Sequence, residues 1–160
     1  MVKFHEEYNT KEKAENAIIL ERETKRQDRL IKLYDYTYNK IVRTVELAAE
    51  KIRFVIEEGG KESEFAYERG LISVRKYYQD RYNVISDSAN NEKNVLDKNM
   101  AAYVENYAEQ WLLAGENLEK KEDLDRALEA EEDKHQKALL GIEKRSSGVV
   151  KYCTRMVIAE

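Results

Sequence analysis

The sequence predicts an all-α protein, an elongated antiparallel bundle of three to four long helices with coiled-coil-like packing. The 160 residues contain no proline, although a chain of this length would hold about eight on average. Alanine, leucine, glutamate, lysine and arginine are abundant, and apolar residues recur at spacings of three and four. Because proline is the residue that most strongly breaks a helix, its absence favours long uninterrupted helices.

Composition also bounds the class of protein. We expect one helical domain over 1–160, since the sequence shows neither an internal repeat nor a flexible linker. Lys and Arg number 28 against 32 Asp and Glu, a net charge of −4, which is not the strongly basic balance of a typical nucleic-acid-binding domain. Cys153 is the only cysteine, so no intrachain disulfide forms and a cytoplasmic location is expected. No apolar run approaches the roughly 20 residues of a membrane span.

The first helix is predicted over residues 10–58. Asn9 and Glu12 have the spacing of a capping box, which satisfies free amides at a helix start. Gly59 and Gly60 are predicted to end this helix, because glycine readily adopts the left-handed conformation that closes one.

A seven-residue repeat runs through this first helix, and ten of its twelve core positions are apolar or tyrosine. Thr24 and Gln27 are the exceptions, and such a polar layer typically fixes the register or the number of partners. After Leu30 the apolar surface widens, so the helix needs more than one neighbour. The core positions are Ala17, Thr24, Ile31, Tyr38, Val45, Ile52, Leu20, Gln27, Tyr34, Ile41, Ala48 and Val55, flanked on one side by Val42, Ala49 and Ile56 and on the other by Leu33, Leu47 and Phe54.

The rest of the chain is predicted to form further helices over 63–85 and 91–120, separated by a turn in the polar segment Ser86–Lys93. Gly70 inside the second helix indicates a close approach or a bend. The apolar pattern changes phase between Gly115 and Asp123, which indicates either a kink or a break that starts a fourth helix over 122–145. The tail 149–160 is predicted to be a short helix or an ordered segment. The long first helix is expected to pack antiparallel against the second helix and parts of the third.

Chemical motifs are sparse. Glu132 and His135 form a Glu-x-x-His pair of the kind that binds metals in carboxylate bundles. Such bundles need a second pair, and the other histidine, His5, has no glutamate three residues before it. A structural histidine is therefore favoured, with no metal, cofactor or catalytic residue expected, and a metal-binding bundle is the third interpretation. Phosphate-binding loops, serine nucleophile elbows and zinc-spaced cysteines are absent from the sequence.

Two charged segments are candidates for binding a macromolecule. Arg22, Arg26 and Arg29 lie on one helix face, but acidic neighbours favour a solvated surface, so nucleic-acid binding is the alternative and not the leading interpretation. Residues 116–133 carry nine acidic and three basic side chains. An ordinary solvated helix side is the favoured interpretation, and a docking surface for a basic partner is the alternative that the excess of negative charge supports. Its central residues are Glu129, Glu131 and Glu132.

The expected function is that of a non-enzymatic helical scaffold or adaptor that binds a protein partner, a second copy of itself, or both. Unequal helix lengths would leave apolar surface uncovered in a monomer, which favours assembly. The candidate partner-binding residues are Thr24, Gln27, Ile31, Tyr34, Tyr38, Trp111, Glu129, Glu131 and Glu132.

Overall fold

The protein consists of three long helices. The computed structural model describes the backbone of residues 2–158 and the side chains of residues 10–158. Helix α1 spans Val2–Glu68, α2 spans Val74–Leu113 and α3 spans Leu118–Ile158, and the described backbone contains no strand. The predicted all-α class and the elongated antiparallel bundle are confirmed, with three helices rather than four.

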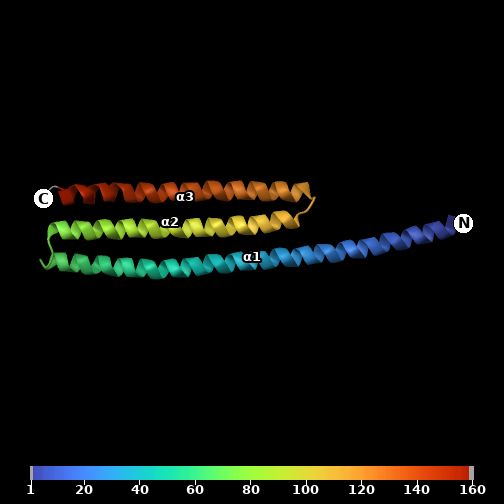
Figure 1. Ribbon diagram of the computed structural model, residues 1–160, viewed down its shortest axis with the longest axis horizontal. Coiled ribbons are helices and arrows are strands. Elements are labelled where there is room, and N and C mark those ends of the chain that lie inside the picture. The colour runs from blue at the N-terminus through green and yellow to red at the C-terminus, as the bar shows by residue number, and fades with distance from the viewer. Residues whose placement is uncertain (1, 159–160) are drawn as a thin grey trace.

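The helices lie side by side in one layer, with α2 in the middle (Figure 1). Over residues 2–158, direct helix packing joins α1 to α2 and α2 to α3, while no close backbone contact joins α1 to α3. The third helix was predicted over 91–120, and the part of it that contacts α1 is the second half of α2. Helix α1 has 67 residues, about 100 Å at 1.5 Å per residue. It extends past the turn between α2 and α3 (Figure 1), and residues 10–26 are all exposed.

Very little of this layer is buried. Among the described side chains only Ala102, Ile142 and Cys153 are fully buried. The chain of 18.8 kDa exposes 12655 Å², whereas a compact monomer of that mass exposes roughly 8,300 Å². Both faces of the layer are therefore open to solvent or to another molecule.

The heptad positions through which α1 packs on α2 change along the helix. In the first half it follows the predicted core positions, since Ile31, Tyr34 and Tyr38 are half-buried. In the second half Val42, Ala49 and Ile56 are half-buried beside the core position Val45, whereas the core positions Ile41, Ala48, Ile52 and Val55 are exposed. A straight α-helix has 3.6 residues per turn and drifts by about 20° per heptad from a repeat of 3.5. Part of the predicted core of α1 is therefore left uncovered in this chain.

The predicted ends of the first helix are wrong. Helix α1 already includes Asn9, so Asn9 is not an N-cap, and its side chain lies outside the described ones. At the other end α1 continues through Gly59 and Gly60. A Cβ on Gly60 would lie 3.4 Å from Val84 Cγ2, so this glycine allows close packing on α2 and does not close the helix.

The turn between α1 and α2 lies about ten residues later than predicted. Gly70 has a φ of +69°, the left-handed conformation that terminates helices. The amide of Gly70 donates to Tyr67 O at 2.9 Å, and that of Leu71 to Ala66 O at 2.8 Å. Gly70 therefore ends α1, and the prediction that it lies inside a helix is wrong.

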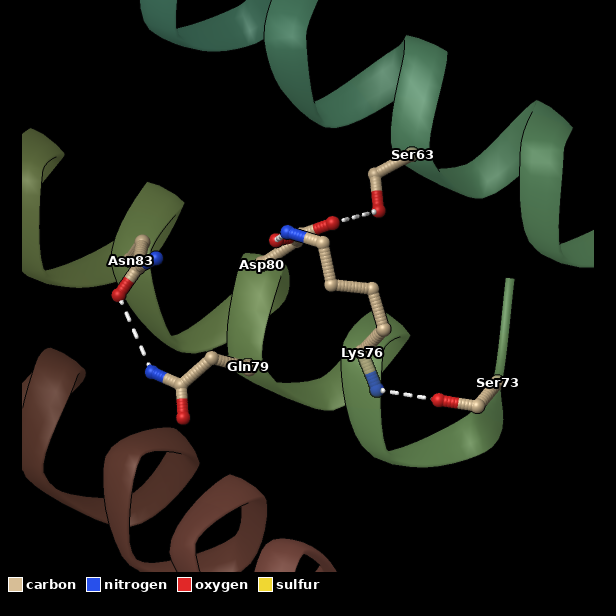
Figure 2. Close-up of polar contacts among 6 residues, drawn as sticks. All are labelled: Ser63, Ser73, Lys76, Gln79, Asp80 and Asn83. Carbon is tan, nitrogen blue, oxygen red and sulfur yellow. Dashed lines mark hydrogen bonds and ion pairs between the residues drawn. The ribbon is translucent and has the colours of Figure 1, made fainter.

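Helix α2 starts at a serine cap that Figure 2 shows beside a contact to α1. The Oγ of Ser73 accepts a hydrogen bond from Lys76 N at 3.1 Å. Asp80 accepts one from Ser63 Oγ of α1 at 2.8 Å and also pairs with Lys76. The cap and the carboxylate together fix the start of α2 against the end of α1.

The predicted turn at Ser86–Lys93 is wrong, because α2 runs through it without interruption. The segment lacks glycine and proline, and Asn91 Nδ2 donates across to Ala49 O at 3.1 Å. Packing on both neighbours outweighs the modest helix preference of serine, asparagine and aspartate. The predicted division into helices 63–85 and 91–120 is therefore replaced by a single α2.

The predicted phase change after Gly115 is a true break. Gly115 has a φ of +56°, and Asn117 caps α3 by accepting a hydrogen bond from Lys120 N at 3.0 Å. The helix predicted over 122–145 is longer at both ends, since α3 continues through Gly148 into the tail. Cys153 is fully buried there, and Val157 O accepts hydrogen bonds from the Arg75 guanidinium at 3.1 and 3.2 Å. The tail is helical because it is docked on the start of α2.

Candidate functional site

The structure places three of the candidate partner-binding residues in the contact between α1 and α2. Ile31, Tyr34 and Tyr38 are half-buried there. The ring of Tyr38 meets that of Tyr103 edge to face, with centroids 5.9 Å apart. These side chains hold the chain's own helices together.

The tyrosine phenols of this contact have altered acidities. The charge of Glu109 raises the pKa of Tyr34, and burial and a hydrogen bond to the same carboxylate add to the effect. Burial raises the pKa of Tyr38 and of Tyr103, and the charge of Glu131 raises both further. All three phenols are neutral at physiological pH and act as packing groups, and Tyr34 also forms the hydrogen bond to Glu109.

Trp111 does not join these residues. It lies near the end of α2, where the ammonium Nζ of Lys121 from α3 stands 3.6 Å from its ring centroid. Such a cation–π contact stabilises the turn between the two helices. Trp111 is therefore an anchor between α2 and α3, on a different contact from Tyr34 and Tyr38.

The two polar core positions have different surroundings. Thr24 is exposed, and its Oγ1 donates to Leu20 O of the preceding turn at 2.9 Å. Gln27 is half-buried and lines a groove with Ile31, Gln110 and Leu124. The side chains of Thr24 and Gln27 therefore do not lie together as one polar level of the helix contact within this chain.

The charged candidate residues also differ in exposure and in position. Glu131 is half-buried and pairs with Lys134 at 3.1 Å, whereas Glu129 and Glu132 are exposed. Arg22, Arg26 and Arg29 line a shallow exposed hollow on the protruding part of α1. A partner that docks on α3 therefore meets Glu129 and Glu132 more directly than Glu131.

His135 has a carboxylate neighbour, but not the predicted one. Its Nε2 lies 3.0 Å from Asp97 Oδ1 of α2. Among the described residues no group of three or more His, Cys, Asp or Glu side chains is arranged to hold a metal ion. The contact with Asp97 links α2 to α3.

An open groove of about 570 Å³ is lined by residues of all three helices. Its floor is apolar and its rim is charged, with Arg145 paired to Glu92 at 2.6 Å. The floor and rim consist of Ala49, Val95, Leu96, Ala138 and Ile142 with Glu46, Glu50, Arg53, Glu92, Lys137 and Arg145.

A polar cluster between α1 and α2 was missed from the sequence. Asp35 Oδ1 accepts hydrogen bonds from Gln110 Nε2 at 2.9 Å and from Asn106 Nδ2 at 3.3 Å. Asp35 is adjacent to Tyr34 and lies at the edge of the predicted core positions. Its contact with α2 depends on the register of α1 against α2, which the sequence does not show.

The largest uncovered apolar surface lies on α1, and we call it the outer face. Its seven members are between 38% and 70% exposed: Leu33, Tyr36, Ile41, Leu47, Ile52, Phe54 and Val55. Steps of 100° per residue place them on one side of α1, roughly 130° from the side that packs on α2. Leu33, Leu47 and Phe54 were recognised in the sequence as a flank that needs a further neighbour, and no described residue covers them.

Threonines on the outer face are compatible with burial. The Oγ1 of Thr37 donates to Leu33 O at 2.9 Å, and that of Thr44 donates to Lys40 O at 2.8 Å. Because both hydroxyls are satisfied within α1, covering this face would leave neither donor without a partner. The outer face thus has the properties of an interface.

None of the helices, over the residues that the structure describes, carries a stretch long and apolar enough to cross a bilayer. No protein-family model matches the chain, and neither a curated protein nor a solved structure shows significant similarity to it.

Proposed function

We propose that the protein is a non-enzymatic helical assembly module, a scaffold or adaptor that works by binding other protein surfaces through its uncovered apolar faces. The observation that carries this proposal is the single layer of helices with only three fully buried residues among those described. Its free surface exceeds that of a compact monomer of equal mass by roughly half.

The outer face of α1 supports the proposal most strongly. Monomeric soluble proteins rarely expose contiguous apolar patches larger than a few hundred Å², and seven large side chains are exposed here along more than 20 residues of one helix. Covering apolar surface contributes about 25 cal/mol per Å². An assembled state is therefore favoured over a free chain.

Charge gives such an assembly selectivity. Glu129 and Glu132 on α3 offer acidic groups to a basic partner, and the arginines near the start of α1 offer the opposite charge. Cys153 is buried and unpaired, in keeping with work in a reducing compartment such as the cytoplasm.

Light scattering coupled to size-exclusion chromatography tests the proposal on protein isolated from its native host under mild conditions. The expected mass is well above 18.8 kDa, either as a homo-oligomer or with a companion protein. A homogeneous species of 18.8 kDa that unfolds cooperatively would overturn it.

A further inference from the structure

We infer that the outer face of α1 binds the outer face of α1 in a second copy of this chain, with the two helices antiparallel and Thr44 close to the twofold axis. This inference rests on the proposed function and names the partner of its main surface. Helix α1 lies at the edge of the layer (Figure 1), so this side is free to receive a second copy.

The charge distribution along α1 selects the antiparallel orientation. Residues 22–43 contain seven basic and three acidic side chains, a net charge of +4. Residues 46–68 contain three basic and seven acidic side chains, a net charge of −4. In an antiparallel pair the positive half of each helix lies along the negative half of the other, whereas in a parallel pair like charges meet along the whole length.

The apolar residues fix the register. With Thr44 on the axis, positions whose numbers add up to 88 lie at the same level. Leu33 then meets Val55, Tyr36 meets Ile52 and Ile41 meets Leu47, and each pairing occurs twice by symmetry. All six side chains are exposed in the single chain, so this register covers nearly the whole outer face.

The same register brings opposite charges together at the ends of the outer face. Arg26 lies level with Glu62 of the second copy, and Arg29 lies one residue from the level of Glu58. Lys40 and Lys51 also lie on this side of α1, and their long stems can lie along the seam while their ammonium groups reach solvent at its edge. Arg26 and Arg29 thereby gain carboxylate partners, whereas no ion pair with another described residue holds them in the single chain.

The area that remains exposed is sufficient for such an interface. Each chain exposes roughly 4,000 Å² more than a compact monomer of its mass, and obligate dimers bury about 1,000–2,500 Å² on each partner. The protruding start of α1 adds to the contact, since Ile18 of one copy comes close to the level of the exposed Leu71 of the other.

Distances between spin labels test the orientation directly. Labels are attached to cysteines introduced as Lys32→Cys or Asn39→Cys in a Cys153→Ala background, at exposed positions outside the outer face. In the antiparallel dimer the two copies of residue 32 lie about 36 Å apart along the axis and those of residue 39 about 15 Å apart, at 1.5 Å per residue. Dilution with unlabelled protein removes the signal if it arises between chains.

A charge exchange tests the register. Arg26→Glu is expected to weaken the dimer roughly tenfold, because two symmetry-related pairs change sign. Adding Glu62→Arg in the same chain restores the affinity, whereas in a parallel dimer each altered residue meets itself and nothing is restored. Lys32→Glu is the matched control and changes the dissociation constant less than about twofold.

Equally short distances at residues 32 and 39 would overturn the inference in favour of a parallel pair. A chain that stays monomeric at the concentrations of the spin-label experiment would also overturn it. Neither result removes the proposed assembly function, which fails only if the natively isolated protein is itself a lone monomer.

Discussion

At individual residues, the effect of glycine on this chain depends on where it lies relative to the helix ends. Gly59 lies inside α1, where a Cβ would meet no atom within 4 Å. Gly70 lies in the turn after α1 with a φ of +69°, which an L-amino acid with a side chain adopts only at a cost of about 1–2 kcal/mol. The same substitution at the two sites should therefore have opposite effects on stability.

Gly59→Ala is expected to raise the free energy of unfolding by about 1 kcal/mol, the difference in helix propensity between the two residues. Gly70→Ala is expected to lower it by at least as much. Urea unfolding, monitored by circular dichroism at one fixed protein concentration, measures both changes in the free energy of unfolding. A stabilising Gly70→Ala would show that α1 does not end there.

The phenols between α1 and α2 predict how stability depends on alkaline pH. Burial raises the pKa of Tyr38 and of Tyr103 above the value of about 10 that holds in the unfolded chain. The unfolded state then loses its phenol protons first, so the stabilisation is present below pH 10 and is lost as pH rises through the folded pKa.

We therefore expect the urea midpoint to fall as the pH rises above about 10, and to fall less steeply when both tyrosines are replaced by phenylalanine. Midpoints measured in parallel at pH 8 correct for any loss of packing from the substitutions. An identical decline in the double variant would mean that these phenols are as accessible as in the unfolded chain.

At the level of helices, the sequence predicted which segments are helical better than where each helix stops. Absence of proline and the apolar spacing correctly indicated long helices. The phase change between Gly115 and Asp123 correctly indicated an interruption, although α2 ends at Leu113 and not at residue 120 as predicted. Gly59 and Gly60 were misleading, because glycine serves close packing as well as helix termination. The polar segment Ser86–Lys93 was misread as a turn, since its helical state depends on contacts with α1 such as Asn91 with Ala49.

The candidate site was predictable to a similar extent. The need for a second neighbour on the side of Leu33, Leu47 and Phe54 follows from the apolar pattern. The apolar pattern does not show which core positions α2 covers, because the drift between 3.5 and 3.6 residues per turn shifts Ile52 and Val55 out of the contact. The place of Asp35 facing Gln110 likewise requires the register of two helices that are distant in sequence.

The docked tail of α3 gives a prediction at this scale. Cys153 is fully buried at the contact with α2, so a reagent reaches its thiol only when the tail opens. If opening costs about 3 kcal/mol or more, the native thiol reacts with a disulfide reagent at least 100-fold more slowly than the thiol of the protein unfolded in urea. Ser147→Cys in a Cys153→Ala background, exposed on the same helix, should react at once. Fast labelling of native Cys153 would show that the tail is not docked.

For the whole molecule, the single-layer arrangement determines how the protein is stabilised. Helices α1 and α3 each bury one side against α2, and α1 has an additional apolar face that nothing described in this chain covers. Three such helices form an incomplete bundle, and the charge reversal along α1 favours the proposed second copy as the molecule that completes it. Folding and assembly are then linked, since binding to the folded state adds to its stability.

The dependence of thermal unfolding on protein concentration tests the central claim, that a second copy covers the outer face of α1. Between about 0.1 and 100 μM, linkage for a dimer supplies about 4 kcal/mol, which for two chains of this length raises the unfolding midpoint by about 6 °C. The account predicts this rise in circular dichroism melts of the wild-type chain, and its loss in the Leu47→Lys, Phe54→Lys variant, whose substitutions lie outside the contact with α2. A midpoint that is constant within about 1 °C over the same range would contradict it.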